Sequence, residues 1–110
     1  MKAPRETDLV GASLAYLGLA RVFAWRCNGG AVKIGKRFIR FASINGIADI
    51  LGVLPDGRFL AVECKRPGGR VRPDQRAFLD SVTASGGLAL VVRDVLELQR
   101  LLQVEGYEVP

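Results

Sequence analysis

The chain of 110 residues contains no histidine, two cysteines, one methionine and one tryptophan. The absence of histidine excludes Ser-His-Asp triads and histidine-ligated metals, so any chemistry must use carboxylates, lysine, hydroxyls or a metal bound through oxygen. Cys27 and Cys64 lie far apart and form no Cys-x-x-Cys motif. We therefore interpret them as buried free thiols in preference to a disulfide.

Long apolar segments are also lacking. No stretch approaches the ~20 apolar residues of a membrane helix, so we expect no membrane partner. Arg5, Glu6 and Asp8 precede an apolar stretch that glycines interrupt, which is a poor signal peptide. A hydrophobic fraction of 49% with 25% charged residues is typical of globular chains. The sequence thus predicts a single domain over residues 1–110 in the cytoplasm.

Acidic residues are missing from residues 21–40, which contain six basic side chains: Arg21, Arg26, Lys33, Lys36, Arg37 and Arg40. Residues 58–76 carry six further basic side chains, whereas the charged residues after them are mostly acidic. A polarised surface of this kind suits a polyanion such as nucleic acid. A soluble basic protein without such a ligand fits the charge pattern equally well.

Hydrophobic periodicity and turn residues predict an α/β domain. Helices are expected at residues 5–20, 73–85 and 95–104, and strands at 22–27, 31–34, 38–41, 49–54, 59–65 and 88–92. The order is therefore α-β-β-β-β-β-α-β-α, with a parallel crossover from the fifth strand to the sixth. This order predicts a mixed β-sheet flanked by helices. We expect Leu9, Ala12, Tyr16 and Leu19 or Ala20 on the buried face of the first helix. The aromatic residues Phe23, Trp25, Phe38 and Phe41 are interpreted as core residues in preference to interface residues.

Three charged residues interrupt the fourth and fifth strands. Asp49 stands at the start of one apolar run, and Glu63 and Lys65 at the end of the next. Glu63 and Lys65 share one face of their strand, because side chains two residues apart point the same way. A hairpin closed by the turn Pro55-Asp56-Gly57 would bring Asp49 beside Glu63.

Two adjacent carboxylates repel each other unless a cation lies between them. Asp49, Glu63 and the backbone carbonyl of Cys64 could therefore form an open magnesium site, with Lys65 orienting a water or stabilising charge on a phosphate. The alternative is a rim salt bridge between Lys65 and one of the acids. The basic, glycine-rich residues 66–72 favour the metal site, because such a loop suits a phosphate backbone.

These residues also carry a resemblance to a known family. The motifs are Gly46-Ile47-Ala48-Asp49, Glu63-Cys64-Lys65 and the helix-borne Gln75. They resemble the PD-(D/E)XK nuclease superfamily, and nearly the whole chain is similar to the stand-alone VRR-NUC domain proteins of phages and bacteria. The similar segments include "WRCNGGAVKIGKRFIRF", "KRPGGRVRPDQRAFLDSV" and "GGLALVVRDVLEL". Ala48 departs from the family pattern, which often has a proline there.

The resemblance implies a restriction-endonuclease-like fold and a Mg²⁺- or Mn²⁺-dependent endonuclease. Asp49 and Glu63 would be metal ligands, Lys65 the water-orienting or charge-stabilising residue, and Gln75 a supporting catalytic residue. Glu6 matches an acidic residue that the first helix brings toward the metal in this superfamily. From the residues alone, Glu6 is a helix-end charge and Gln75 an exposed first-turn residue.

The basic residues that we expect to contact DNA are Arg26, Lys33, Lys36, Arg37, Arg66, Arg70, Arg72 and Arg76. Stand-alone members of the family are associated with homodimers that cut branched DNA such as four-way (Holliday) junctions. The resemblance therefore implies a homodimer acting on branched DNA in a bacterial or phage-infected cell. The alternative is a non-catalytic DNA-binding module with the same fold.

Overall fold

The computed structural model describes residues 5–27, 31–40 and 44–110, and of residues 31–33 and 38–40 it describes the backbone alone. The elements are α1 (Glu6–Leu19), β1 (Phe23–Arg26), β2 (Ala31–Ile34), β3 (Arg37–Arg40), β4 (Ile50–Val53), β5 (Phe59–Cys64), α2 (Pro73–Ala84), β6 (Leu88–Val92) and α3 (Val95–Val104). Within these described parts, none of the helices has the length and apolar character needed to cross a membrane.

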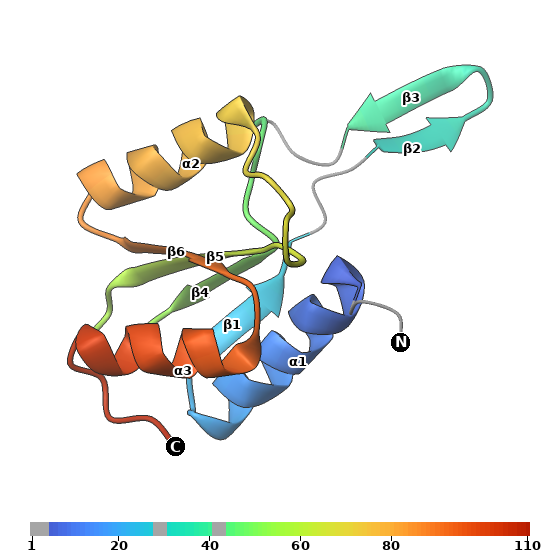
Figure 1. Ribbon diagram of the computed structural model, residues 1–110. Helices are drawn as coiled ribbons and strands as arrows, with labels where there is room; N and C mark the ends of the chain where they lie inside the picture. The colour runs from blue at the N-terminus through green and yellow to red at the C-terminus, as the bar shows by residue number, and fades with distance from the viewer. Residues whose placement is uncertain (1–4, 28–30, 41–43) are drawn as a thin grey trace.

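Four strands form one mixed sheet in the order β1-β4-β5-β6, while β2 and β3 form a separate two-stranded sheet. β4 pairs with β1 and β5 in antiparallel register, and β5 pairs with β6 in parallel. Figure 1 shows α2 on one face of the sheet and α1 with α3 on the other. The predicted mixed α/β sheet with flanking helices and a parallel crossover is therefore confirmed. β2 and β3 do not join that sheet.

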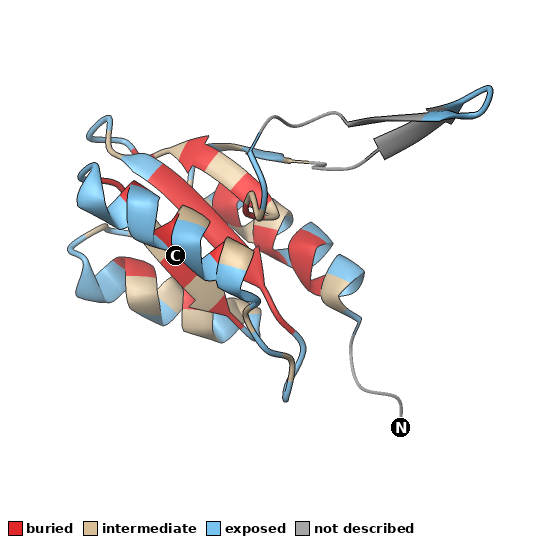
Figure 2. Cartoon of the chain, turned by 90° about the horizontal axis from the view of Figure 1, so that it is seen from above, coloured by how far each residue is buried: buried red, intermediate tan, exposed pale blue. Residues whose placement is uncertain are grey.

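The sheet separates two apolar clusters because its central strand, β5, is buried on both faces. Leu60 and Val62 pack with residues of α1 and α3, while Ala61 packs with Leu79 of α2. Figure 2 shows buried residues running along the centre of the sheet. Burial on both sides holds the end of β5 in a fixed place, and Glu63 lies at that end.

The buried face of α1 differs from the predicted one. Its buried residues are Leu9, Val10, Ser13 and Leu17. Leu19, which we expected as one alternative for this face, is 76% exposed. Apolar residues occur on all sides of this helix, so spacing alone did not identify the side that meets the sheet.

The prediction that Phe23 and Trp25 lie mainly in the core is wrong. Phe23 is 72% exposed and Trp25 is 40% exposed, and their rings lie 5.2 Å apart. β1 is an edge strand, and α2 contacts β5 and β6 without covering β1. Alternate residues of β1 therefore face solvent on the side of α2. The side chain of Phe38 and all of Phe41 lie outside the described residues.

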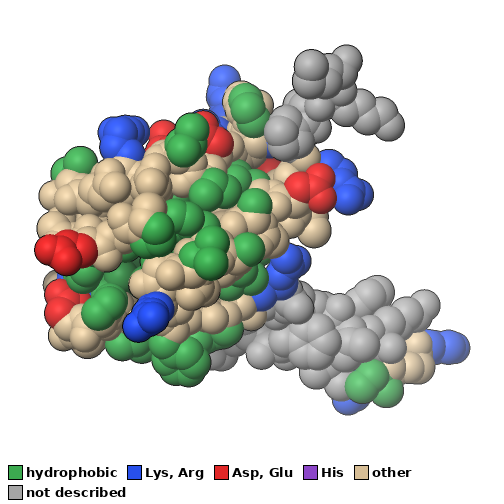
Figure 3. All heavy atoms as spheres, turned by 90° about the horizontal axis from the view of Figure 1, so that it is seen from below, with side chains coloured by type: hydrophobic (Ala, Val, Ile, Leu, Met, Phe, Trp, Pro, Cys, Tyr) green, Lys and Arg blue, Asp and Glu red, His purple; other side chains and the backbone are tan. Residues whose placement is uncertain are grey.

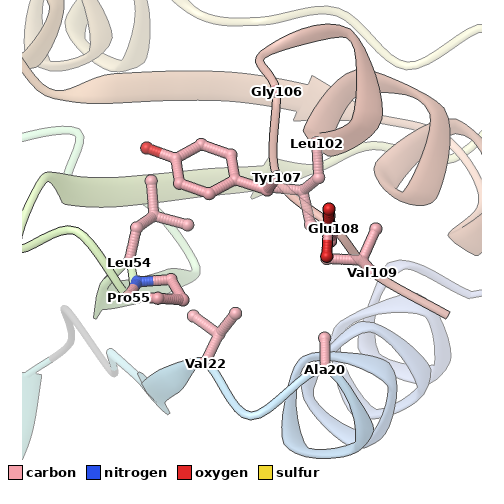
Figure 4. A pocket seen from close by; sticks show the side chains of 9 residues that line it. All are labelled: Ala20, Val22, Leu54, Pro55, Leu102, Gly106, Tyr107, Glu108 and Val109. Carbon is pink, nitrogen blue, oxygen red and sulfur yellow. The ribbon is translucent and has the colours of Figure 1, made fainter.

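The C-terminal segment packs at the end of the sheet far from Glu63. Tyr107 donates a hydrogen bond to Asp56 in the β4–β5 turn, and Tyr16 of α1 donates one to the carbonyl of Pro110. Figure 4 shows the cavity of about 230 Å³ between this segment, the turn and the end of α1. On the side of α1 and α3, hydrophobic side chains are visible at the surface (Figure 3), and Leu19, Leu96 and Val104 are strongly exposed. The hydrogen bonds of Tyr107 and Tyr16 tie the C-terminal segment to the fold.

Candidate active site

The hairpin of β4 and β5 brings Asp49 and Glu63 together as predicted. Ile50 pairs with Val62, so the next pair outward in the antiparallel register is Asp49 with Glu63. The Asp49 carboxylate accepts a hydrogen bond from the backbone N–H of Cys64 through Oδ2, at 2.8 Å. This bond fixes the Asp49 side chain across the end of the two strands.

Glu63 is 2% exposed and therefore lies in a position where a carboxylate is costly. The side-chain amide of Gln75 donates a hydrogen bond to Oε1 of Glu63 at 3.2 Å, and Oε2 of Glu63 is buried with no hydrogen-bond partner among the described residues. Burial, followed by the nearby Asp49 carboxylate, raises the pKa of Glu63 to about 8. The ionised form of the Glu63 carboxyl is thus disfavoured in the folded protein, and Oε2 of the same group lacks a partner among the described residues.

Lys65 lies between two acids and is only 6% exposed. Its Nζ atom is 3.9 Å from Oε1 of Glu63 and 4.0 Å from Oε1 of Glu6. A salt bridge between Lys65 and Glu63 is therefore present. The alternative interpretation required it to lie on the exposed rim, whereas both side chains are buried. Glu6 is a first-turn charge of α1 that also reaches this group.

Gln75 connects α2 to the carboxylates. It is 6% exposed, so the interpretation of Gln75 as an exposed first-turn residue is wrong. Its Oε1 accepts a hydrogen bond from the backbone N–H of Arg72 at 2.9 Å, while its amide nitrogen donates to Glu63. One side chain thus closes the N-terminal end of α2 and holds Glu63 in place.

Gly46 allows this helix to approach the site, and sequence reasoning did not assign it that role. Its φ is +72°, and a Cβ there would lie 2.6 Å from the backbone nitrogen of Gln75 and closer still to the backbone of Asp74. Glycine is the residue that tolerates both the positive φ and the contact. The signal in the sequence that could have indicated this role was a glycine three residues before the candidate metal ligand Asp49.

A cleft of about 130 Å³ opens beside Asp49, and its lining residues are Glu6, Thr7, Val10, Arg26, Cys27 and Asp49. Arg26 is exposed and reaches this cleft from the end of β1. Both cysteines are free; Cys64 is buried as expected, but Cys27 is only partly buried. Cys27 directly follows β1, which is the edge strand, so fewer neighbouring elements cover its side chain.

The predicted DNA-contacting residues fall into three groups. Arg26 lies at the cleft, Lys36 and Arg37 are exposed at the β2–β3 turn, and the others that the structure describes lie between β5 and the first turns of α2. The side chain of Lys33 is outside the described part. Arg72 and Arg76 form exposed ion pairs with Asp74 and Asp80, whereas Arg66 and Arg70 form none with the described residues. The charges of Arg66 and Arg70 are thus not neutralised by a described carboxylate, and the same holds for Arg26, Lys36 and Arg37.

Arg93 holds the loop that follows Lys65, a role that sequence reasoning missed. Its Nη1 donates hydrogen bonds to the carbonyls of Arg66 and Gly69, each at 2.9 Å. These two bonds fix the turn from which the basic residues project. The loop and Arg93 are distant in sequence, and only the parallel pairing of β5 with β6 brings them together.

The carboxylates suit a hard divalent cation. Asp49 and Glu63 are oxygen donors at the end of neighbouring strands, and Oε2 of Glu63 lacks the partner that a cation would supply. Among the described residues, no group of three or more His, Cys, Asp or Glu side chains could hold a metal. Magnesium commonly uses one or two carboxylates and keeps several waters, so two are sufficient.

Mg²⁺ should raise the melting temperature of the wild-type protein, because binding to the folded state relieves the repulsion of the carboxylate pair. Asp49→Asn should abolish this shift. Asp80→Asn is the matched control, since Asp80 is an exposed aspartate on α2 that pairs with Arg76. Thermal scans with and without Mg²⁺ would measure the effect, and an equal shift in Asp49→Asn would contradict a metal site at this pair.

The fold and the site together define a small mixed α/β domain with two carboxylates and a lysine gathered at one end of its central strands. The family model described as the VRR-NUC domain matches residues 18–95. The chain therefore belongs to the VRR-NUC domain family, which confirms the resemblance seen in the sequence. No curated protein and no solved structure matches it.

Family membership makes the chain a nuclease-like domain that acts on DNA. Nuclease domains of this family typically use divalent metals, which agrees with the oxygen donors at the site. Asp49, Glu63, Lys65 and Gln75 lie within the matched residues, whereas Glu6 lies before them. Glu6 is linked to the site by its 4.0 Å contact with Lys65 and by its place in the cleft beside Asp49.

Proposed function

We propose that the chain is a Mg²⁺- or Mn²⁺-dependent endodeoxyribonuclease that hydrolyses phosphodiester bonds. The observation that carries this proposal is the pair formed by Asp49, which is partly buried, and Glu63, which is buried. Oε2 of Glu63 has no hydrogen-bond partner among the described residues, and Oε1 accepts a hydrogen bond from Gln75. A purely DNA-binding module would gain nothing from carboxylates, because they repel phosphate. A restriction-endonuclease-like arrangement and a single domain over residues 1–110 are part of this proposal.

Asp49, Glu63 and the carbonyl of Cys64 would hold the metal, with Glu6 as a further acid nearby. The metal would supply Lewis-acid stabilisation of the phosphate charge and a more acidic water. Gln75 keeps Glu63 oriented through the 3.2 Å hydrogen bond. Lys65 has its ammonium group beside the carboxylates, where it can orient the attacking water or stabilise negative charge on a phosphate oxygen.

Basic residues on both sides of the site would hold the DNA backbone. Arg26 lies at the cleft beside Asp49, and Arg66 and Arg70 project from the loop after Lys65. Arg72, Arg76, Lys33, Lys36 and Arg37 would extend this contact. Because these contacts are with phosphates, they would position the strand without reading its sequence.

We further propose a homodimer that acts on branched DNA such as four-way junctions. A two-fold dimer presents two identical sites, which suits two symmetric strands. Phe23 and Trp25 on the exposed edge strand β1 supply apolar surface of the kind that a second copy would cover. The cellular setting of this proposal is the cytoplasm of a bacterium or a phage-infected host.

The test is cleavage of labelled DNA by the purified protein. A four-way junction and a linear duplex of the same sequence are incubated with Mg²⁺, Mn²⁺ or EDTA. We expect cleavage with either metal, none with EDTA, and faster cleavage of the junction. Absence of cleavage of both DNA forms would overturn the nuclease proposal, whereas equal cleavage of both would overturn only the preference for branched DNA.

A further inference from the structure

A second cavity near the carboxylates, separate from the cleft at Asp49 and from the cavity of Figure 4, lies against another side of α1. The cleft is lined by Glu6, Thr7 and Val10 of α1, while the second cavity is lined by Arg5, Asp8, Leu9 and Ala12. This cavity has a volume of about 270 Å³. The first turn of α1 therefore separates two hollows, of which the nuclease proposal uses only one.

This cavity is an open hollow bounded by three segments that are distant in the sequence. They are α1, the loop after β5, and the start of α3, which converge near the middle of Figure 1. Its apolar lining residues are Leu9, Ala12, Pro67 and Val95. Such a lining suits a flat apolar group, and the volume is just below the roughly 300–1,000 Å³ of sites for larger ligands.

The cavity adjoins the carboxylate site at two points along the chain. Arg66 lines the cavity and directly follows Lys65, and Arg5 lines it and directly precedes Glu6. Nζ of Lys65 and Oε1 of Glu6 are only 4.0 Å apart. A nucleotide next to a phosphate held at the carboxylates would therefore lie within reach of the cavity.

The basic residues of the cavity differ in how they are engaged. Arg5 pairs with Asp8 at 3.2 Å, and Arg93 donates two hydrogen bonds to the loop after β5. Arg66 forms no side-chain hydrogen bond or ion pair with the residues that the structure describes. Its guanidinium is thus available to stack on a base or to contact a phosphate, on a loop that Arg93 holds in place.

The occupant that fits these observations is a nucleobase. A base has an apolar face that packs on Leu9 and Pro67, and a guanidinium such as that of Arg66 stacks on it. The carboxylates of Asp8 and Asp94 also line the cavity. Asp8 pairs with Arg5, and Asp94 caps α3, but the carboxylates keep further lone pairs that can accept hydrogen bonds from the amino groups of bases.

We propose that this cavity takes an unpaired nucleobase of the DNA strand whose backbone lies at Asp49 and Glu63. The inference rests on the proposed function in that DNA is the ligand. A base must leave the helical stack to enter, and this costs least where it is already unpaired. The cavity would thus favour strands with an unpaired nucleotide beside the cut over a perfect duplex.

The test compares two identical substitutions on one helix. Ala12→Phe fills the cavity, whereas Ala15→Phe places the same ring at another exposed position of α1 outside it. The probe is a single-stranded oligonucleotide with one 2-aminopurine, titrated in EDTA and followed by fluorescence. We expect about tenfold weaker binding for Ala12→Phe and wild-type binding for Ala15→Phe, because stacking a base contributes strongly to affinity.

A scan with abasic residues locates the base that enters. In wild type, an abasic residue at one position of the oligonucleotide should weaken binding, and in Ala12→Phe this dependence on position should disappear. Melting temperatures close to wild type would establish that both variants are folded. Binding by Ala12→Phe equal to that of Ala15→Phe, or no dependence on position in wild type, would overturn the inference.

This binding assay is independent of the cleavage assay. Because it is run in EDTA, loss of binding in Ala12→Phe would support the cavity even if no DNA were cut by wild type. Cleavage by wild type together with unchanged binding in Ala12→Phe would overturn the cavity and leave the nuclease intact. No binding of single-stranded DNA by wild type would overturn the inference whatever the cleavage result.

Discussion

Asp49→Asn and Glu63→Gln are each expected to lower the rate of DNA cleavage by about 10³-fold or more. Each substitution removes one negative oxygen donor from the pair while it keeps the size of the side chain. Asp49 also holds the N–H of Cys64 at 2.8 Å, and Glu63 accepts the hydrogen bond of Gln75. Single-turnover cleavage of a labelled junction in Mg²⁺ would measure the loss, with Glu108→Gln, at an exposed acid of the C-terminal segment, expected at wild-type rate.

Glu63→Gln should lose activity without losing stability, which separates a catalytic role from a structural one. The pKa of Glu63 is raised from 4.5 to about 8, so the folded state binds more protons than the unfolded state between these values. In EDTA, wild-type stability should therefore fall as the pH rises from about 4.5 to about 8. Glu63→Gln should lack this fall, as urea denaturation at several pH values would show. A large loss of stability in Glu63→Gln at pH 8 would contradict this assignment.

Gly46→Ala is expected to destabilise the fold by about 3 kcal/mol, the largest effect on stability that we expect from adding one methyl group. The positive φ of +72° is unfavourable for alanine, and the added Cβ would collide with the backbone of Asp74 and Gln75. The start of α2 must then move away, which carries Gln75 from Glu63. Cleavage should fall about 100-fold even where the variant is folded, because small displacements at a site have such effects.

Gly57→Ala provides the matched comparison for this prediction. Gly57 also has a positive φ, +89°, but no atom lies within 4 Å of an added Cβ. It lies in the β4–β5 turn, at the opposite end of the hairpin from the carboxylates. We expect a loss of only about 1 kcal/mol and unchanged cleavage, because only the cost of the backbone conformation remains. Urea denaturation of both variants would measure the difference, and equal losses would show that the contact with α2 is unimportant.

The sequence predicted the parts of the site that depend on local rules. The turn at residues 55–57 between two apolar runs predicted the hairpin, and the hairpin predicted that Asp49 would meet Glu63. The spacing of Glu63 and Lys65 predicted one shared face. These relations depend on neighbouring residues of one hairpin, for which strand geometry leaves few alternatives.

Other features depended on which surfaces of distant segments meet. Phe23 and Trp25 looked like core residues because they are aromatic, but β1 is an edge strand that α2 does not cover. The predicted buried face of α1 was partly wrong, because apolar residues occur on all sides of that helix. Gln75 looked exposed because it stands in a first turn, yet α2 turns it toward Glu63.

The sequence by itself determined the class of domain, its family and the pairing of two carboxylates with Lys65. The tertiary structure decided how that group is held and what lies around it. It brought Gly46 against α2, placed Arg93 under the loop after β5, and set Glu6 within 4.0 Å of Lys65. These contacts join residues far apart in the chain, so they follow from packing on the two faces of the sheet and not from any local pattern.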